Sequence, residues 1–332
     1  MRKLFLAIGT AILMTSCAVQ TAENAYNQSL KSITVDNLKK DLYTIASPEM
    51  EGRATGSEGQ KKAGRYMIAQ YEENQIGHPP SMDSYYQHVP SEFMSKRTTI
   101  PDSENILAYI QGSEKPDEII VVSAHYDHVG MQGGVLHPGA DDDGSGTVAV
   151  MAIAQAFQKA KKMGFGPKRS ILFLHVTGEE RGLLGSSYYS ENPIFPLENT
   201  VADLNIDMIG RVDPEHKGNE NYVYVVGSEM LSSQLKKIIE EENDKLDKMN
   251  LDYKFDDPKD PMRIYYRSDH YNFAKHNIPI AFFFDGIHED YHKPGDTPDK
   301  IDYPLLAKRT QLVFAAAWNL ANRQDKIVVD KK

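Results

Sequence analysis

The sequence predicts a single three-layer α/β/α domain with a central, mostly parallel sheet that includes some antiparallel pairing. Short apolar segments alternate with helical stretches, and no Pro-, Gly- or Ser-rich linker interrupts the chain after residue 35. The short segments are apolar almost throughout, which is typical of strands covered by helices on both faces. Strands that alternate with helices favour an α/β domain.

Five short segments, each apolar and rich in β-branched or aromatic residues, are predicted strands. They are residues 119–123, 171–176, 204–209, 222–226 and 278–284. Five longer segments with helical spacing of apolar residues are predicted helices, namely residues 35–45, 58–73, 147–161, 230–245 and 303–322. We therefore expect one folded domain over residues 35–325, followed by a polar tail at 326–332.

The N-terminus has the order of an export signal. Arg2 and Lys3 precede an apolar run at residues 4–14, and two small residues then lead to Cys17, the single cysteine of the chain. Such a run is too short for a bilayer-spanning helix, which needs about 20 residues, and its order is typical of a signal peptide. Because the cysteine follows directly, the segment resembles a bacterial lipobox.

This resemblance implies a lipoprotein signal peptide at residues 1–16 and a tether at residues 17–34. A lipid on Cys17 would anchor the domain to a membrane of the bacterial cell envelope, outside the cytoplasm. A cleaved signal with an incidental cysteine is the alternative.

Composition disfavours several other classes of protein. Asp and Glu total 47 against 37 Lys and Arg, a net charge of −10, which disfavours nucleic-acid binding. One cysteine excludes an internal disulfide framework and a cysteine-based zinc site. We expect a monomeric domain with no second membrane segment.

Acidic residues and histidines follow most of the predicted strands, where ligands of open α/β sheets gather. The segments are His125–His128, the string GADDDGSG at 139–146, Glu179-Glu180, Asp207 and residues 288–292. Crowded buried carboxylates need protons or cations to coexist, and carboxylates with histidines suit zinc, manganese or cobalt. If one carboxylate bridges two such ions, a pair about 3.5–4 Å apart can clamp the attacking and leaving oxygens together. A further carboxylate that is not a ligand would serve as general base.

The motifs AHYDHVG, PGADDDGSGT, TGEERGLLGS, NIDMIG, SDHYNF and YHKPGDTPD, with EGRATGS near the domain start, resemble the co-catalytic di-zinc exopeptidases. That family includes aminopeptidase Y, aminopeptidase S and bacterial leucyl aminopeptidases, with glutamate carboxypeptidase II and glutaminyl cyclase as relatives. The resemblance covers residues 36–320 and implies the zinc-peptidase (phosphorylase/hydrolase-like) architecture. It also implies an aminopeptidase that acts on peptides with free N-termini.

By this resemblance, two zinc ions would be held by five residues: His125 and Asp207 on one, Glu180 and His292 on the other, with Asp142 bridging both. Glu179 would be the general base for a water that bridges the zinc ions. Asp127 would hydrogen-bond the imidazole of His125 and fix its orientation. Tyr291 would stabilise the oxyanion, with packing as its alternative.

Other polar residues near the motifs receive structural roles. His128 is not assigned to a metal, because His125 already fills that position, and His270 is assigned to the pocket lining. Asp141 and Asp143 would hold the turn and the helix start. Three further residues are predicted at the rim, namely His137, His288 and Glu289.

Three other functions stay open at this point. A glutaminyl cyclase would need a single zinc, whereas ligands for two are present here. A carboxypeptidase or dipeptidase could use the same metal core. A non-catalytic binding protein is disfavoured by the complete ligand set and the presence of Glu179.

Overall fold

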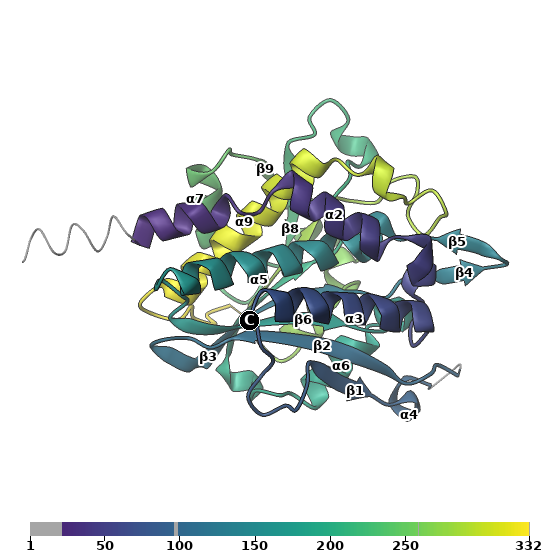
Figure 1. The fold of residues 1–332 in the computed structure, drawn as a ribbon. Helices are drawn as coiled ribbons and strands as arrows, with labels where there is room; N and C mark the ends of the chain where they lie inside the picture. The colour runs from purple at the N-terminus through teal and green to yellow at the C-terminus, as the bar shows by residue number, and fades with distance from the viewer. Residues whose placement is uncertain (1–21, 96–98, 258, 332) are drawn as a thin grey trace, which may run out of the picture.

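The computed structural model describes residues 22–95, 99–257 and 259–331, and within them one mixed sheet forms the centre of the molecule (Figure 1). Its eight strands have the order β1-β2-β6-β3-β7-β10-β8-β9. Their bounds are β1 Tyr86–Val89, β2 Ser103–Ile110, β3 Lys115–His125, β6 Arg169–Val176, β7 Thr200–Ile206, β8 Tyr222–Val226, β9 Asn250–Asp252 and β10 Ile280–Phe284. The neighbours β6, β3, β7 and β10 run parallel, whereas β2 and β8 flank them antiparallel. The predicted mixed, mostly parallel sheet is confirmed.

Helices cover both faces of this sheet. One face carries α2 (Val35–Ile45), α3 (Glu58–Glu73), α5 (Gly146–Lys162), α7 (Leu235–Lys245) and α9 (Tyr303–Asn322) (Figure 1). The other face carries α6 (Leu184–Glu191) and α8 (Tyr271–Ala274). Along β3, Val122 packs in the first core and Val121 in the second. This explains why the central strands are apolar at every position rather than at alternate ones.

The register of the parallel strands aligns their carboxyl ends. His125 at the end of β3 lies opposite Val176 at the end of β6. Ile206, the last residue of β7, pairs with Phe283 of β10. The segments that follow these strands therefore leave the sheet at the same edge.

The structure also contains elements that the apolar pattern did not predict. One of them is the strand β2, next to the short edge strand β1, and its polar residues Ser103 and Asn105 are buried. Ser103 donates to Gln60 and Asn105 donates to Gln87, so these side chains are satisfied inside the fold. These polar residues open the strand and precede its apolar run at residues 106–110, a run to which no strand was assigned from the sequence.

Residues 22–30 of the predicted tether are helical and lie against the domain. The ring of Tyr26 stacks on Phe314 at a centroid distance of 5.9 Å and contacts Trp318 at 5.5 Å. Cys17 and the proposed signal lie outside the described residues. No helix in the described part of the chain is long and apolar enough to cross a membrane.

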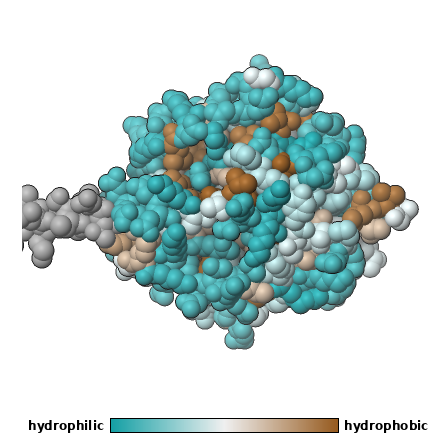
Figure 2. Space-filling model, turned by 45° about the horizontal axis from the view of Figure 1, so that its top comes forward, coloured by the Kyte–Doolittle hydropathy of each residue, from teal (hydrophilic) through white to brown (hydrophobic). Residues whose placement is uncertain are grey.

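The face shown in Figure 2 is mainly hydrophilic, in keeping with the acidic composition. One hydrophobic group lies on the hairpin of β4 (Gly130–Gln132) and β5 (Val135–His137), which projects from the domain. This hairpin connects the residues after β3 to η2 (Ala140–Ser145), the segment that precedes α5.

Candidate metal centre

The acidic and histidine segments converge at the carboxyl edge of the sheet. His125 ends β3, Glu179 and Glu180 lie in η3 (Glu179–Arg181) directly after β6, and Asp207 follows β7. Asp142 lies in η2, and His292 lies in the loop after β10. All the predicted ligand residues thus lie at the carboxyl edge of the sheet, where the aligned parallel strands end.

The two carboxylate oxygens of Asp142 face different partners. On one side, His125 Nε2 lies 3.3 Å from Asp142 Oδ1 and 3.5 Å from Asp207 Oδ1. Ligand atoms of these three residues lie within 4.8 Å of one another. They form one candidate cation site, which we call the His125 half.

On the other side, Asp142 Oδ2 lies 3.0 Å from His292 Nε2, which is also 3.2 Å from Glu180 Oε2. His128 Nδ1 lies 3.0 Å from Glu180 Oε1 and 3.7 Å from Asp142 Oδ2. We call these four residues the Glu180 half. Asp142 is common to both halves, as the predicted bridging role requires.

The atoms of the Glu180 half fit a cation. Asp142 Oδ2, Glu180 Oε1 and His128 Nδ1 are buried and have no hydrogen-bond partner in the described residues. A buried polar atom without a partner costs about 1–3 kcal/mol. An oxygen and nitrogen donor set of this kind suits zinc, which would satisfy these atoms together.

Hydrogen bonds orient His125 for ligation. Its Nδ1 donates to the main-chain carbonyl of Asp127 at 3.0 Å, which turns Nε2 toward Asp142 and Asp207. The prediction expected an Asp127–imidazole hydrogen bond, and the structure assigns it to the carbonyl, because the carboxylate Oδ1 lies 3.8 Å away. That carboxylate instead accepts from Thr55 Oγ1 at 2.6 Å and from the Glu179 amide at 3.2 Å. Asp127 therefore ties β3 to the segment that carries Glu179.

The loop around Asp142 is fixed by buried side chains. Asp143 accepts from the amide of Gly146 at the start of α5 at 2.9 Å, as predicted. Asp141 was predicted to hold the same turn, but its side chain accepts from the amide of Gly210, in the segment after β7, at 2.7 Å. Asp296 accepts from the amides of Asp141 and Asp142. Arg53 donates to the carbonyls of Pro138 and Gly139 at 2.8 Å.

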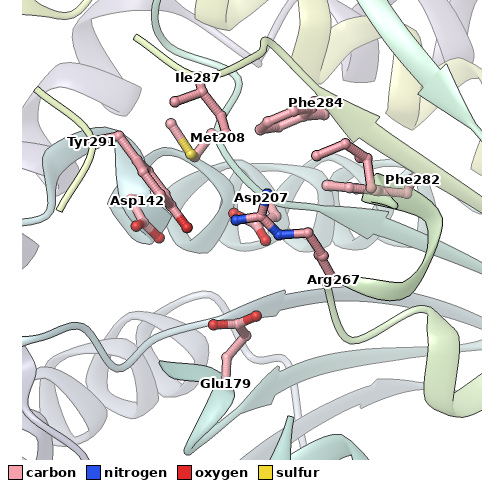
Figure 3. Close-up of a pocket in the computed structure, with 10 residues that line it drawn as sticks. Asp142, Glu179, Asp207, Met208, Arg267, Phe282, Phe284, Ile287 and Tyr291 are labelled. Carbon is pink, nitrogen blue, oxygen red and sulfur yellow. The ribbon is translucent and has the colours of Figure 1, made fainter. Parts of the chain in front are cut away.

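A pocket opens directly beside the acidic cluster. Figure 3 shows Glu179 facing Asp142 and Asp207 across it, with Tyr291 beside Asp142. The remaining lining residues are Met208, Ile264, Arg267, Phe282, Phe284 and Ile287. Burial raises the pKa of Glu179 well above its usual range, and Asp207 raises it further. A carboxylate whose pKa is raised in this way, on the wall of a pocket, suits proton transfer.

The other predicted residues divide between the pocket and the interior. Tyr291 lines the pocket and stacks on His292 at a centroid distance of 3.9 Å. His270 does not line this pocket, since it is buried and bonds to the carbonyl of Tyr265. His288 is not at the rim, because it is buried with Nε2 at 3.2 Å from Asp141 Oδ2.

Sequence reasoning missed three groups of this site. Thr55 and Arg53 lie in the EGRATGS string, which was noted without assigning its residues, and Asp296 lies in YHKPGDTPD. Arg267 directly precedes the SDHYNF string, and Figure 3 shows its guanidinium turned toward Asp207. His128 was considered and set aside, although its side chain faces Glu180.

The fold and this cluster define an α/β domain with a candidate metal site at the carboxyl edge of its sheet. Residues 105–317 match Peptidase family M28, and the chain belongs to that family. The predicted family resemblance is thereby confirmed.

Individual relatives agree with this placement. A probable zinc metalloprotease of Pyricularia oryzae is 27% identical over 261 residues, which cover 67% of this chain and 51% of that protein. The Legionella pneumophila LapA aminopeptidase has a similar fold, with a TM-score of 0.67 and 22% identity over 91% of this chain and 75% of that one. A Bacteroides thetaiotaomicron glutaminyl cyclase also has this fold, with a TM-score of 0.65 and 17% identity over 86% of this chain and 98% of that one. The chain spans about half the length of the first of these relatives.

Proposed function

We propose that this protein is a zinc-dependent aminopeptidase that removes apolar residues from the N-termini of peptides. The observation that carries the proposal is the position of Asp142, whose two oxygens face two separate ligand sets beside a pocket that contains Glu179. The family membership and the zinc metalloprotease among the relatives support the same chemistry.

His125 and Asp207 would hold one zinc ion, Glu180 and His292 the other, and Asp142 both. When bound, two zinc ions lower the pKa of the attacking water and polarise the peptide carbonyl. Glu179 takes the proton from this water and returns it to the departing amine. Tyr291, which lines the same pocket, would donate to the developing oxyanion.

The pocket lining supports the choice of substrate. Five apolar side chains suit an apolar side chain of the substrate's first residue, namely those of Met208, Ile264, Phe282, Phe284 and Ile287. The acidic residues Glu179 and Asp207 on the same pocket favour the free α-ammonium group next to it.

One feature favours a second candidate on the same metal core. Arg267 is the basic residue among those that line the pocket, and a guanidinium is suited to a substrate carboxylate. A carboxypeptidase or dipeptidase would use it to bind the C-terminal carboxylate. The fold alone does not separate a peptidase from a glutaminyl cyclase, because the Legionella aminopeptidase and the Bacteroides glutaminyl cyclase both have this fold.

The first experiment combines metal analysis with a substrate panel. We expect about two zinc ions per chain and chelator-sensitive hydrolysis of leucyl- and phenylalanyl-anilides. N-acetylated peptides and an N-terminal glutamine peptide complete the panel. One zinc with cyclisation of the glutamine peptide would favour the cyclase, and cleavage of acetylated peptides from the C-terminus would favour the carboxypeptidase.

Glu179→Gln tests the proton transfer separately. Because the amide cannot accept the proton, we expect kcat to fall about 10²–10⁴-fold, the usual contribution of a general base. Zinc content should stay unchanged. Glu241→Gln, the same substitution on the exposed surface of α7, is the control and should retain activity. Normal turnover by Glu179→Gln would exclude Glu179 as the base.

We also propose that the protein is exported and attached to a bacterial membrane through a lipid on Cys17. The support is the order of charged, apolar and small residues before this cysteine. Cys17→Ala, expressed in a bacterial host, should move the protein from the detergent phase to the aqueous phase. Equal partition of both forms would contradict the proposed anchor.

A further inference from the structure

His128 lies three residues after His125, and its side chain is fully buried. Its Nδ1 lies 3.0 Å from Glu180 Oε1 and 3.7 Å from Asp142 Oδ2. Its ring contacts that of His292 edge-on, at an interplanar angle of 69° and with the centroids 5.8 Å apart. Glu180 thus has one imidazole near each carboxylate oxygen, since His292 Nε2 lies 3.2 Å from Oε2.

The contact between His128 and Glu180 is close, but it is not aligned as a hydrogen bond. His128 Nδ1 and Glu180 Oε1 both lack a hydrogen-bond partner within the described residues, and so does Asp142 Oδ2. Ligand atoms of these three residues lie within 4.8 Å of one another. Leaving each atom unsatisfied in the interior costs about 1–3 kcal/mol. A single cation in contact with all three would remove that cost.

We propose that His128 is an additional ligand of the metal ion held by Asp142, Glu180 and His292. The two halves of the site are then unequal. Three protein residues serve the His125 half, and four serve the Glu180 half. The metal in the Glu180 half should therefore bind more tightly and leave last when a chelator is added.

This inference rests on the proposed function only in requiring that the protein binds metal. The test is a zinc titration of the purified protein in competition with a chromophoric chelator, which gives a dissociation constant for each site. In His128→Ala, we expect one of the two sites to weaken by at least about 100-fold, beyond the usual effect of losing an outer hydrogen bond to a ligand. The other site should keep its affinity.

His137→Ala is the matched control, because His137 is a buried histidine on the same connection whose Nδ1 bonds to the carbonyl of Val135. It should retain both affinities. His292→Ala is the positive reference and should weaken the same site as His128→Ala. If His128→Ala loses its circular dichroism signal, His128→Gln, which is closer in volume, takes its place.

Cobalt substitution gives a second readout that does not depend on activity. Loss of a ligand changes the coordination number, so His128→Ala should alter the visible absorption bands of the tighter-bound cobalt ion. The proposal is overturned if the zinc affinity of His128→Ala falls by less than about 10-fold. It is also overturned if the affinity falls by about 10–100-fold while the cobalt spectrum stays unchanged, because His128 would then lie outside the metal's coordination. If the wild-type protein itself binds fewer than two metals, the proposed function fails instead.

Discussion

Single buried carboxylates in this protein behave differently according to their partners. Burial by itself would raise the pKa of Asp142, but the imidazoles of His128, His125 and His292 around it hold this pKa well below the usual range. Among the residues that the structure describes, no imidazole acts in this way on Asp203, in the middle of β7. Burial raises its pKa to about 8, even though it accepts a hydrogen bond from Ser123 at 2.7 Å.

The raised pKa of Asp203 predicts a loss of stability as the pH rises. The folded state keeps the proton up to about pH 8, whereas the unfolded chain loses it near the ordinary value of 3.8. Between these values the folded state binds about one more proton, so the free energy of unfolding falls by up to about 1.4 kcal/mol per pH unit. Asp203→Asn should remove this part of the decline.

Urea unfolding between pH 5 and pH 8 measures this effect. Asp117→Asn, at an exposed position near the start of β3, is the control and should keep the wild-type slope. Equal slopes in wild type and Asp203→Asn would show that Asp203 is not protonated in the folded state.

At the scale of elements, η2 positions Asp142 because it approaches the segment after β3 very closely. Gly139, directly before η2, has φ +58°, a conformation that favours glycine. A Cβ at this position would lie 2.3 Å from the Asp142 carbonyl oxygen and 2.5 Å from the His128 ring. The missing side chain thus allows both metal-facing residues to occupy their places.

Gly139→Ala should therefore damage the metal centre more than the fold. The added methyl group must displace Asp142, His128 or both, so we expect zinc affinity to fall at least about 10-fold, comparable with losing a residue that orients a ligand. Isothermal titration calorimetry with zinc measures the change. Gly133→Ala is the control, since Gly133 also has a positive φ but a Cβ there meets no atom within 4 Å. If Gly139→Ala and Gly133→Ala lose zinc affinity equally, backbone strain alone would explain the loss.

At the scale of the whole molecule, the sheet assembles residues from five distant segments into one acidic site. Asp142 and Asp207 are buried, and the side chain of Glu180 is 6% exposed. Carboxylates at such short distances repel one another unless cations or protons balance them. Metal ions that bind only the folded state should therefore contribute to global stability.

Removal of zinc should lower the melting temperature, and added zinc should restore it. A metal at about 100 times its Kd stabilises the folded state by about 2.7 kcal/mol, which corresponds to a shift of several degrees for a domain of this size. Differential scanning calorimetry with and without a chelator measures it. Asp142→Ala, which lacks the carboxylate common to both halves, should show little response to zinc, and a full response would contradict the bridging role.

Much of this architecture could be predicted because local patterns and global fold agree. Helices α2, α3 and α9 have the predicted bounds, since each has a clear apolar face and a side-chain cap at Thr34, Ser57 and Asp302. The predicted strand at 204–209 ends earlier, at Ile206, because Asp207 and Met208 leave the sheet to reach the site. The start of helix 230–245 was likewise placed too early, since α7 begins at Leu235.

The order of residues along the chain by itself determined the fold class, the edge of the sheet where the site lies, and the candidate ligands from His125 to His292. Periodicity and motif order are local properties, and the alignment of parallel strands follows from them. Only the tertiary structure decided that His128 faces Glu180, that Asp127 orients His125 through its carbonyl, and that Arg267 reaches the pocket. These facts depend on side-chain direction and on contacts between distant segments, which no spacing within one segment can specify.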